Sequence, residues 1–248
     1  MVPASDTPLS RTSVVIPTLN EGASIGAVLD ELPKGLLEVL IVDGNSADGT
    51  QGIARAKGAR VIVEARKGYG RAYKTGFLEA RGEFIATLDG DLTYPAERIG
   101  ALVERLSRGG LDFITCDRLS TLRREAMSRK HRFGNFVLST TARVLFGVPV
   151  KDSQSGMWVF RREVLKDLSI SADGMPFSEE LKVEAFRARP RGCIELPIDY
   201  RVRVGEAVLS TWRDGFRNLT FLFKKRLGRA RSPKGELFSP QSSAAGPR

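Results

Sequence analysis

Ile85-Ala-Thr-Leu-Asp89-Gly-Asp91-Leu-Thr-Tyr-Pro95 is the stretch of sequence that decides the fold. The apolar run 84–88 predicts a buried strand, and the Tyr-Pro pair predicts the start of a polar helix over 96–108. Asp89 and Asp91 therefore lie at the carboxyl end of a strand, where open α/β sheets bind ligands. Together they can reach one hard cation, Mg²⁺ or Mn²⁺, and leave positions open for phosphate oxygens. The alternative is an ordinary turn, since Asp-Gly is common in turns; the flanking segments favour the ligand site.

Strands and helices alternate along the first half of the chain. We expect strands at 13–16, 38–42, 60–63, 84–88 and 113–116, with helices at 20–32, 46–57, 70–80 and 96–108 between them. This alternation predicts an α/β fold with a single Rossmann-like, mostly parallel sheet flanked by helices. In the second half we expect strands at 157–160 and 193–197, and helices at 133–146, from Arg161, at 178–187 and at 211–227.

The chain of 248 residues, 42% of them hydrophobic, is long enough for one large domain with tails. We assign an N-terminal tail to 1–11, the domain to 12–228 and a disordered basic tail, rich in Ser, Pro, Gly and Arg, to 229–248. No apolar run approaches the roughly 18 residues of a membrane span, and no signal peptide is visible. Two distant cysteines predict buried free thiols and a cytoplasmic protein, and the single His131 argues against a His-rich metal site.

The net charge of +10 is unevenly distributed. From Arg201 onward the sequence holds eleven Lys or Arg and three Asp or Glu residues, and a second basic cluster spans 118–132. This asymmetry predicts a polyanionic partner, either nucleic acid, an anionic membrane surface or a phosphorylated substrate; a solvated basic face is the alternative. In the predicted helix 211–227, the apolar residues 221–223 precede the basic residues 224–226, which is typical of a membrane-interface helix. Packing on the core is the other explanation of these apolar residues.

Four successive strand ends carry acids or glycines. They are Pro17-Thr-Leu-Asn20-Glu21, Asp43-Gly-Asn-Ser-Ala-Asp48-Gly-Thr50, Lys67-Gly68-Tyr-Gly70-Arg-Ala72 and Asp89-Gly-Asp91. All four lie on one edge of the predicted sheet, which indicates a ligand crevice. The glycines would let the backbone approach a phosphate or ribose, and Asp43 and Glu21 can accept hydrogen bonds from a base or ribose hydroxyl. An ordinary turn is the alternative for Gly68 and Gly70.

These four segments resemble the inverting glycosyltransferase family 2. More narrowly, they are similar to its dolichol-phosphate mannose synthase-like branch, the polyprenyl-phosphate glycosyltransferases. The resemblance covers about residues 12–215. In the second half it is carried by Asp117-Arg118, Asn135, Asp152-Ser-Gln-Ser-Gly156, Phe177-Ser-Glu-Glu180 and Pro197-Ile-Asp-Tyr-Arg-Val-Arg203-Val-Gly-Glu206.

The resemblance implies a GT-A fold and a nucleotide-diphosphate sugar donor of the GDP-mannose or UDP-glucose type. Asp89 and Asp91 would hold Mg²⁺ or Mn²⁺ against the diphosphate of the donor. Thr93 stands where the mannose branch has Gln, so the third protein ligand of the metal is not assigned, and neither is the sugar. The residues expected to contact the nucleotide sugar are Pro17, Asn20, Glu21, Asp43, Gly68, Gly70 and Asp89.

The acceptor is predicted from the arginines of the second half. A sugar hydroxyl needs a general base, whereas a phosphate monoester, with a second pKa of about 6, is already an anionic nucleophile near neutral pH. Arginine matches phosphate geometry, so Arg118, Arg132 and Arg203 are the candidates for binding the acceptor and leaving phosphates. If a base exists, Asp152 is the first candidate and Glu180 the second; the alternative is that Asp152 orients an Arg.

The catalytic set expected from the sequence is therefore Asp91, Asp152, Arg118 and Arg203, with Glu180 and Arg132 beside the acceptor. We expect a metal-dependent enzyme that moves a sugar from a nucleotide sugar to polyprenyl or dolichyl phosphate. It would act peripherally at the cytoplasmic face of the membrane, on an anionic surface or through a membrane-protein partner. One alternative is a soluble or glycan acceptor. A nucleic-acid-binding module is a remote alternative, because the acidic sheet edge would repel nucleic acid.

Overall fold

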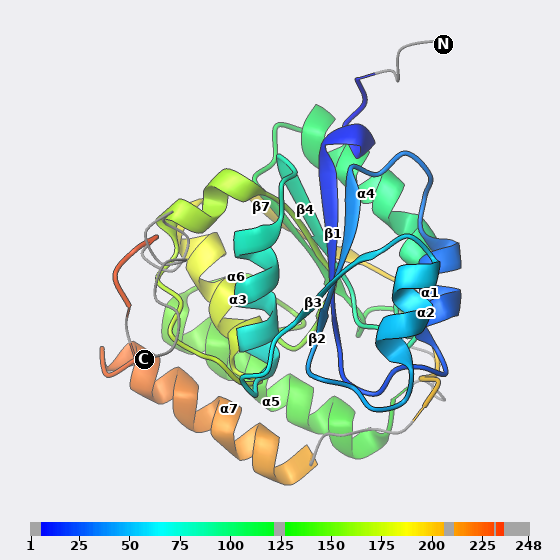
Figure 1. Cartoon of the computed structure of the whole chain (residues 1–248). Coiled ribbons are helices and arrows are strands. Elements are labelled where there is room, and N and C mark those ends of the chain that lie inside the picture. The colour runs from blue at the N-terminus through cyan, green and yellow to red at the C-terminus, as the bar shows by residue number, and fades with distance from the viewer. Residues whose placement is uncertain (1–5, 122–126, 206–210, 231, 236–248) are drawn as a thin grey trace.

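A seven-stranded sheet forms the centre of the molecule (Figure 1). The computed structural model describes residues 6–121, 127–205, 211–230 and 232–235. The strand order is β3-β2-β1-β4-β6-β5-β7, and β6 runs antiparallel to both of its neighbours while the other pairs are parallel. The strands are β1 (Thr12–Thr18), β2 (Glu38–Asp43), β3 (Arg60–Val63), β4 (Phe84–Thr87), β5 (Phe113–Asp117), β6 (Trp158–Arg161) and β7 (Cys193–Pro197). The predicted single, mostly parallel sheet is confirmed.

Helices cover both faces of the sheet because successive strand residues point to opposite sides. Val14 and Ile16 of β1 pack into the core on the face of α1 (Ile25–Glu31), α2 (Thr50–Ala56) and α4 (Ile99–Arg108), whereas Val15 packs into the other core. The second face is covered by α3 (Tyr69–Glu79) and α6 (Phe177–Ala188), with α5 (Arg129–Phe146) and α7 (Thr211–Arg226) beside them (Figure 1).

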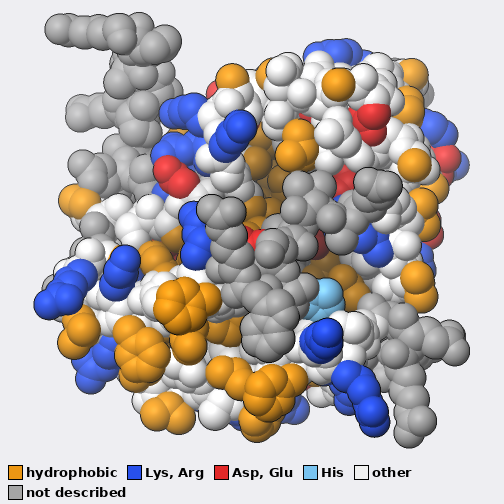
Figure 2. Space-filling view, turned by 90° about the horizontal axis from the view of Figure 1, so that it is seen from below, with side chains coloured by type: hydrophobic (Ala, Val, Ile, Leu, Met, Phe, Trp, Pro, Cys, Tyr) orange, Lys and Arg blue, Asp and Glu red, His pale blue; other side chains and the backbone are white. Residues whose placement is uncertain are grey.

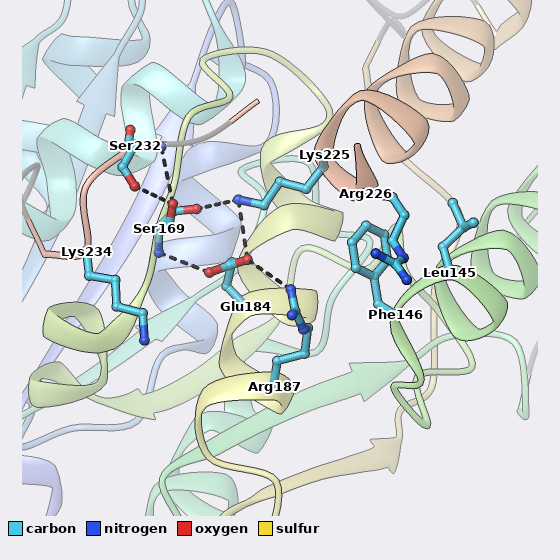
Figure 3. Close-up of a pocket in the computed structure, with 9 residues that line it drawn as sticks. All are labelled: Leu145, Phe146, Ser169, Glu184, Arg187, Lys225, Arg226, Ser232 and Lys234. Carbon is cyan, nitrogen blue, oxygen red and sulfur yellow. Dashed lines mark hydrogen bonds and ion pairs between the residues drawn. The ribbon is translucent and has the colours of Figure 1, made fainter. Parts of the chain in front are cut away.

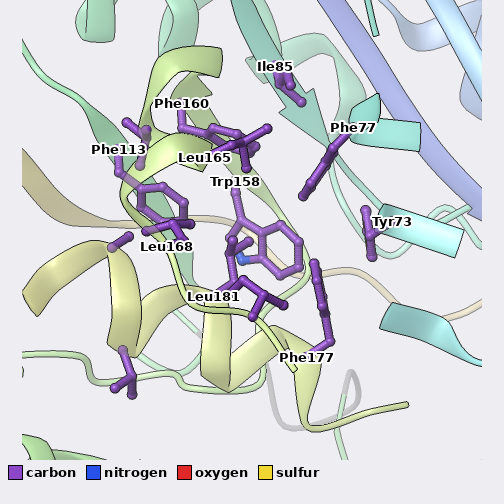
Figure 4. Close-up of a cluster of buried hydrophobic side chains, with 14 of the residues drawn as sticks. Tyr73, Phe77, Ile85, Phe113, Trp158, Phe160, Leu165, Leu168, Phe177 and Leu181 are labelled. Carbon is purple, nitrogen blue, oxygen red and sulfur yellow. The ribbon is translucent and has the colours of Figure 1, made fainter. Parts of the chain in front are cut away.

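The core on the α3 and α6 face is built around aromatic rings (Figure 4). The ring of Tyr73 stacks on Phe177 with centroids 5.7 Å apart, and it lies 5.0 Å from the ring of Trp158. Burying such a side chain contributes about 1.5–3 kcal/mol, so this cluster firmly joins α3, α6 and β6. These three elements carry or border the segments that later form the site.

Helix boundaries differ from the sequence expectation where side chains or glycines act locally. Helix α5 begins at Arg129, four residues earlier than predicted, because the Ser128 hydroxyl caps the amide of His131, and it ends before Gly147 in the left-handed region. The helix expected from residue 20 begins at Ile25, since Asn20 has φ 56° and belongs to a loop. The helix expected from Arg161 is a 3₁₀ helix over Arg162–Asp167. Short 3₁₀ helices also occupy Leu9–Arg11 and Ala96–Arg98.

Part of the predicted C-terminal tail is bonded to the domain. The Ser232 hydroxyl donates to the Ile170 carbonyl at 3.0 Å, and the Gly235 amide donates to the Leu168 carbonyl at 3.0 Å. Residues 1–5 of the predicted N-terminal tail, and 231 and 236–248 of the C-terminal one, lie outside the described residues. In the parts of the chain that the structure describes, every helix is too short or too polar to span a lipid bilayer.

Candidate active site

The candidate site lies at the carboxyl ends of β1, β2 and β4, where parallel strands place their following loops together. These strand ends point toward the side of the molecule occupied by α5 and α7 (Figure 1). Pro17 is the penultimate residue of β1 and pairs with Val42, so it positions the loop that follows.

The loops after β1 and β2 hold each other in place. The backbone amide of Asn20 donates to the Ser46 hydroxyl at 2.8 Å, and the Asn20 side-chain oxygen accepts from the amide of Ala47 at 3.0 Å. The carboxylate of Asp48 accepts from the amide of Gly22 at 2.7 Å. Asn tolerates the left-handed conformation seen at Asn20 better than most residues do. These two loops therefore form a prearranged floor beside the Asp89-Gly-Asp91 turn.

Asp43 is fully buried, and its carboxylate is occupied by the loop that follows it. It accepts hydrogen bonds from the Thr18 hydroxyl at 2.8 Å, from the amide and hydroxyl of Ser46 at 2.8 and 2.6 Å, and from the Gln51 amide group at 2.8 Å. Four donors use the lone pairs of both oxygens. In this structure Asp43 shapes the loop, so its expected contact with a base or ribose stays a prediction.

Gly68 and Gly70 pack closely against residues 172–177. A Cβ at Gly68 would meet the carbonyl of Asp173, and φ at this position is 139°. A Cβ at Gly70 would lie 2.5 Å from the Cβ of Phe177. The expected approach of their backbone to a phosphate or ribose stays a prediction, because these contacts fill only the space that a Cβ would occupy. Glycine is needed at both positions because the start of α3 packs directly against the first residue of α6 and the segment before it.

Asp89 lies in a crowded and negatively charged position. Tyr69 donates its hydroxyl to Oδ1 of Asp89 at 3.2 Å, and a Cβ at Gly156 would lie 3.0 Å from the same oxygen. Burial, and then the charge of Asp91, raise the pKa of Asp89 to about 7, although Arg118 and Arg203 oppose this shift. A bound cation would relieve the repulsion between the two carboxylates. Tyr69 was not predicted as a site residue, although its place between Gly68 and Gly70 was an available signal.

Asp91 is oriented by its own turn and faces Arg203. Its Oδ1 accepts from the amide and hydroxyl of Thr93 at 3.1 and 2.6 Å, and its Oδ2 lies 3.2 Å from the Arg203 guanidinium. Leu92, which lies between Asp91 and Thr93, has φ 63°, a left-handed backbone conformation that leucine rarely adopts. The Thr93 hydroxyl donates to Asp91 in this structure, so the third metal ligand is not assigned to it.

Arg203 also pairs with Glu21, at 2.7 Å, and so connects the loop after β1 with the loop after β4. Burial raises the pKa of Glu21; the charge of Arg203 opposes this shift, and that of Asp91 adds to it. The segment around Arg203 is tied to the Asp89-Gly-Asp91 turn by the amide of Val204, which donates to the Asp91 carbonyl at 3.1 Å. Glu21, Asp91 and Arg203 are therefore brought together from positions far apart in the sequence.

Arg118 and Asp152 form a buried two-point ion pair. The guanidinium donates to both oxygens of Asp152, at 2.7 and 2.9 Å, and the Arg118 amide donates to Oδ2 at 3.1 Å. Burial alone would raise the pKa of Asp152, but the charge and hydrogen bonds of Arg118 hold this pKa below its ordinary value. Asp152 is thus a weak base that orients Arg118. Tyr200, which the sequence reasoning missed, stacks its ring 5.2 Å from the Arg118 guanidinium carbon.

Lys182 is a buried cation that sequence reasoning also missed. Its amine donates to the carbonyls of Asp152 and Ser153 at 3.0 and 2.7 Å, and it lies 5.8 Å from the ring centroid of Trp158. Burial lowers the pKa of Lys182 to about 7, although Asp152 opposes the shift. It supports the loop that carries Asp152, and no local pattern in the sequence marks it.

Glu180 does not belong to the cluster of charged site residues. Its carboxylate accepts from the amides of Ser171 and Ala172, at 3.0 and 2.8 Å, and pairs with Lys225 of α7 at 2.7 Å. The expectation that Glu180 faces the acceptor or acts as a base is therefore wrong. Arg132 is exposed on the first turn of α5, so its contact with an acceptor phosphate stays a prediction.

A pocket of about 480 Å³ lies between the ends of α5, α6 and α7, and Figure 3 shows the residues that line it. Ser169, Glu184 and Lys225 form hydrogen bonds or ion pairs across one side of it. None of the predicted site residues lines this pocket. The charged cluster at the strand ends, rather than this pocket, has the groups that the expected chemistry needs.

The acidic side chains fit a divalent cation that completes its coordination with ligand oxygens. Within the described residues no group of three Asp, Glu, His or Cys side chains is arranged to hold a metal alone. Asp89 and Asp91 supply two carboxylates at one bend, where burial and then the charge of Asp91 raise the pKa of Asp89. Mg²⁺ and Mn²⁺ are commonly held by one or two carboxylates together with phosphate oxygens.

The model of the family described as glycosyl transferase family 2 matches residues 13–169, which include the strand ends that form this site. The chain belongs to glycosyltransferase family 2. The predicted family and its enzymatic class, a glycosyltransferase, are thereby confirmed.

Curated relatives support the polyprenyl-phosphate branch of family 2. The dolichyl-phosphate hexose transferase of Haloferax volcanii is 37% identical over 206 residues, which cover 82% of this chain and 88% of that protein. The low-salt glycan biosynthesis hexosyltransferase Agl6 of the same organism is 35% identical over 227 residues. This match covers 88% of the present chain but only 55% of the length of Agl6.

Solved structures show the same fold. Glucosyl-3-phosphoglycerate synthase from Mycobacterium tuberculosis, in complex with Mn²⁺, uridine-diphosphate-glucose and phosphoglyceric acid, superposes with a TM-score of 0.73 at 23% identity. The match covers 88% of this chain and 79% of the synthase. The predicted GT-A fold is confirmed.

Proposed function

We propose that this family 2 enzyme transfers a hexose from a nucleotide-diphosphate sugar to polyprenyl phosphate, with Mg²⁺ or Mn²⁺ held by Asp89 and Asp91. The observation that carries the proposal is the pairing of Arg118 with Asp152 next to these carboxylates. This pair supplies an oriented guanidinium for a phosphate, and it supports a mechanism without a general base because Arg118 holds the pKa of Asp152 below its ordinary value. The name of the Haloferax dolichyl-phosphate hexose transferase supports the lipid acceptor, and the synthase complex with Mn²⁺ supports the metal.

The donor would lie across the strand ends, with its diphosphate toward the Asp89-Gly-Asp91 turn. A bound divalent cation would neutralise charge on the leaving nucleoside diphosphate as a Lewis acid. Arg203, which pairs with Glu21 and Asp91 in the structure, can exchange these partners for donor phosphate oxygens, since guanidinium binds carboxylate and phosphate with the same geometry. The loops after β1 and β2 would receive the nucleoside.

The acceptor phosphate would approach Arg118. A phosphate monoester carries its own negative charge near neutral pH, so positioning replaces proton abstraction. The ion pair with Asp152 and the ring of Tyr200 hold the Arg118 guanidinium in one orientation. Direct attack of the phosphate oxygen on the anomeric carbon of the donor would invert its configuration and release the nucleoside diphosphate.

We further propose that the enzyme works peripherally at the cytoplasmic face of the membrane, on an anionic surface or with a membrane-protein partner, and that 12–228 form its catalytic domain. A lipid-linked acceptor lies at such a surface. A phosphorylated soluble acceptor is the second candidate, because Arg118 would recognise the phosphate and not the hydrocarbon chain.

A comparison of separate acceptors tests the proposed function. Purified enzyme is given Mn²⁺ and a panel of UDP- and GDP-sugars with polyprenyl phosphate, the matching free polyprenol, or 3-phosphoglycerate, and products are separated by chromatography. We expect transfer to polyprenyl phosphate and none to the alcohol. Equal transfer to the alcohol would contradict the phosphate-nucleophile mechanism, and transfer to 3-phosphoglycerate alone would establish the second candidate.

A further inference from the structure

Helices α5 and α7 pack along one side of the molecule and expose large apolar side chains from both helices. Phe133 and Phe136 of α5 are 68% and 60% exposed, and Phe216 and Phe223 of α7 are 68% and 49% exposed. Figure 2, which views the molecule from this side, shows hydrophobic side chains gathered between Lys and Arg side chains. We call the exposed surface formed by these four phenylalanines the α5–α7 face.

Positive charge dominates the two helices. Together, Arg129–Phe146 and Thr211–Arg226 contain nine Lys or Arg residues and one acid, Asp214. Lys224 and Arg226 are exposed next to Phe223. An apolar, aromatic surface with a basic rim is complementary to a bilayer that carries negative headgroups.

The structure separates the surface residues of α7 from those that anchor it. Leu222 is buried in the core, and Lys225 is buried between Glu180 and Glu184, at 2.7 and 3.3 Å. The expectation that Leu222 inserts into a membrane and that Lys225 faces its headgroups is therefore wrong. Phe216 and Phe223 lie seven residues apart and so on one side of the helix, which leaves them exposed while the anchoring residues face inward.

The α5–α7 face lies beside the site. In Figure 1 both helices cross the side of the molecule to which the strand ends point. Asn218 of α7 donates to the side-chain oxygen of Gln154 at 2.8 Å, in the loop that also contains Asp152, the partner of Arg118. A flat surface in contact with this face would therefore come close to the proposed acceptor position.

We propose that the α5–α7 face docks on an anionic lipid bilayer and thereby presents the site to a lipid-linked acceptor. The second clause rests on the proposed function, whereas the docking does not. A second copy of the chain is a poorer occupant, because it would bring two basic surfaces together. The basic rim predicts docking that weakens as salt rises, since exposed charges are screened over about 8–10 Å near physiological ionic strength.

Vesicle cosedimentation tests the docking. The full chain is mixed with phosphatidylcholine vesicles, with and without phosphatidylglycerol, at increasing salt. Phe216→Ser with Phe223→Ser should lower binding by at least about tenfold, because the variant lacks the two aromatic side chains that would be transferred from water into the bilayer. Lys224→Gln with Arg226→Gln should lower it by about thirtyfold, about fivefold for each charge.

Matched controls lie at the amino ends of the strands, opposite the candidate site. Leu37→Ser removes an apolar side chain that is 48% exposed just before β2, as the Phe variants do on α7. Lys34→Gln with Arg191→Gln removes two exposed charges, as the Lys224 and Arg226 variants do. These controls should bind vesicles as the parent does. Circular dichroism confirms that each variant is folded. Unchanged vesicle binding in both α5–α7 pairs overturns the proposal, as does a dimer in sedimentation velocity that the Phe variants dissociate.

Activity separates this proposal from the proposed function. With polyprenyl phosphate embedded in anionic vesicles, the α5–α7 variants should lose transfer in proportion to binding. With a short-chain prenyl phosphate that dissolves in water, they should keep the parent rate. Vesicle binding without transfer to any prenyl phosphate would refute the proposed function and leave docking intact; transfer to the embedded lipid that is unaffected by loss of binding would refute the role of docking.

Discussion

The two halves of the site are held together by different forces. On the donor side, the loops after β1 and β2 are joined by hydrogen bonds, and the buried Asp43 carboxylate is satisfied by four donors. On the phosphate side, Asp89, Asp91, Arg118 and Arg203 meet as charges from separate elements. Hydrogen bonds within and between these loops give a fixed shape, whereas the ion pairs of the partly exposed Arg203 can be exchanged for a charged ligand. Substitutions should therefore affect catalysis most on the phosphate side, whereas on the donor side they should act mainly through the shape of the loops.

The largest effect is expected at Asp91. Asp91→Asn keeps the acceptor oxygen for Thr93 but removes the negative charge, so turnover should fall on the order of a thousandfold and Mn²⁺ affinity should fall with it. Mn²⁺ binding is measured by electron paramagnetic resonance and turnover by nucleoside diphosphate release. EDTA should stop the parent enzyme and Mg²⁺ or Mn²⁺ should restore it.

Asp48→Asn is the matched control, because Asp48 lies in the donor loops and bonds to Gly22 and Thr50. It should bind Mn²⁺ as the parent does. Full activity of the parent enzyme in EDTA, or equal loss of Mn²⁺ binding in both variants, would remove the distinction between the two halves.

A smaller effect is expected at Asp152, the positioning residue of the phosphate side. Asp152→Asn leaves the buried Arg118 without its counter-charge and should lower the free energy of unfolding by about 3–5 kcal/mol at neutral pH. Because Arg118 holds the pKa of Asp152 below its ordinary value, this stability is present above the unfolded-state pKa of about 3.9 and is lost as pH falls through the folded-state pKa. The stability difference between parent and variant should therefore shrink in acid, which urea unfolding at several pH values measures.

Kinetics distinguish positioning from base catalysis at Asp152. Asp152→Asn should lower kcat/KM for the acceptor by about tenfold to a hundredfold while the acid limb of the pH–rate profile stays, because the weakly basic carboxylate does not take the proton. Disappearance of the acid limb would show that Asp152 is the base and that the acceptor is deprotonated by the enzyme.

The smallest catalytic effect is expected at Asp43 on the donor side. Asp43→Asn keeps the shape of the side chain but replaces an acceptor by a donor facing Ser46 or Gln51. Stability should fall by about 1–3 kcal/mol, and the donor KM should rise only a few fold, because the carboxylate acts through the loop. Asn20→Gly, which tolerates φ 56° but loses the bond to Ala47, is the control and should cost less. A loss of donor binding far larger than the loss of stability would mean that Asp43 contacts the nucleotide directly.

Features encoded locally were predictable from the sequence. The alternation of apolar strands and helices predicted the sheet, and the carboxylates after β4 were expected at its ligand edge. These predictions succeed because periodicity and chain breaks act over a few neighbouring residues. The position of β6, antiparallel between β4 and β5, has no such local signal.

The sequence by itself determined the fold class, the family and the segments that meet at the strand ends. Only the tertiary structure decided the partner of each charge. Arg203 contacts Glu21, 182 residues away in the sequence, and Arg118 contacts Asp152, 34 residues away. Glu180 pairs with Lys225, 45 residues away, and not with the residues of the site. The tertiary structure also packs Phe177 against Gly70, where a side chain would have no room. The physical reason is that charge pairing and close packing depend on which surfaces the folded chain brings within a few ångströms, and residue order along the chain does not specify that distance.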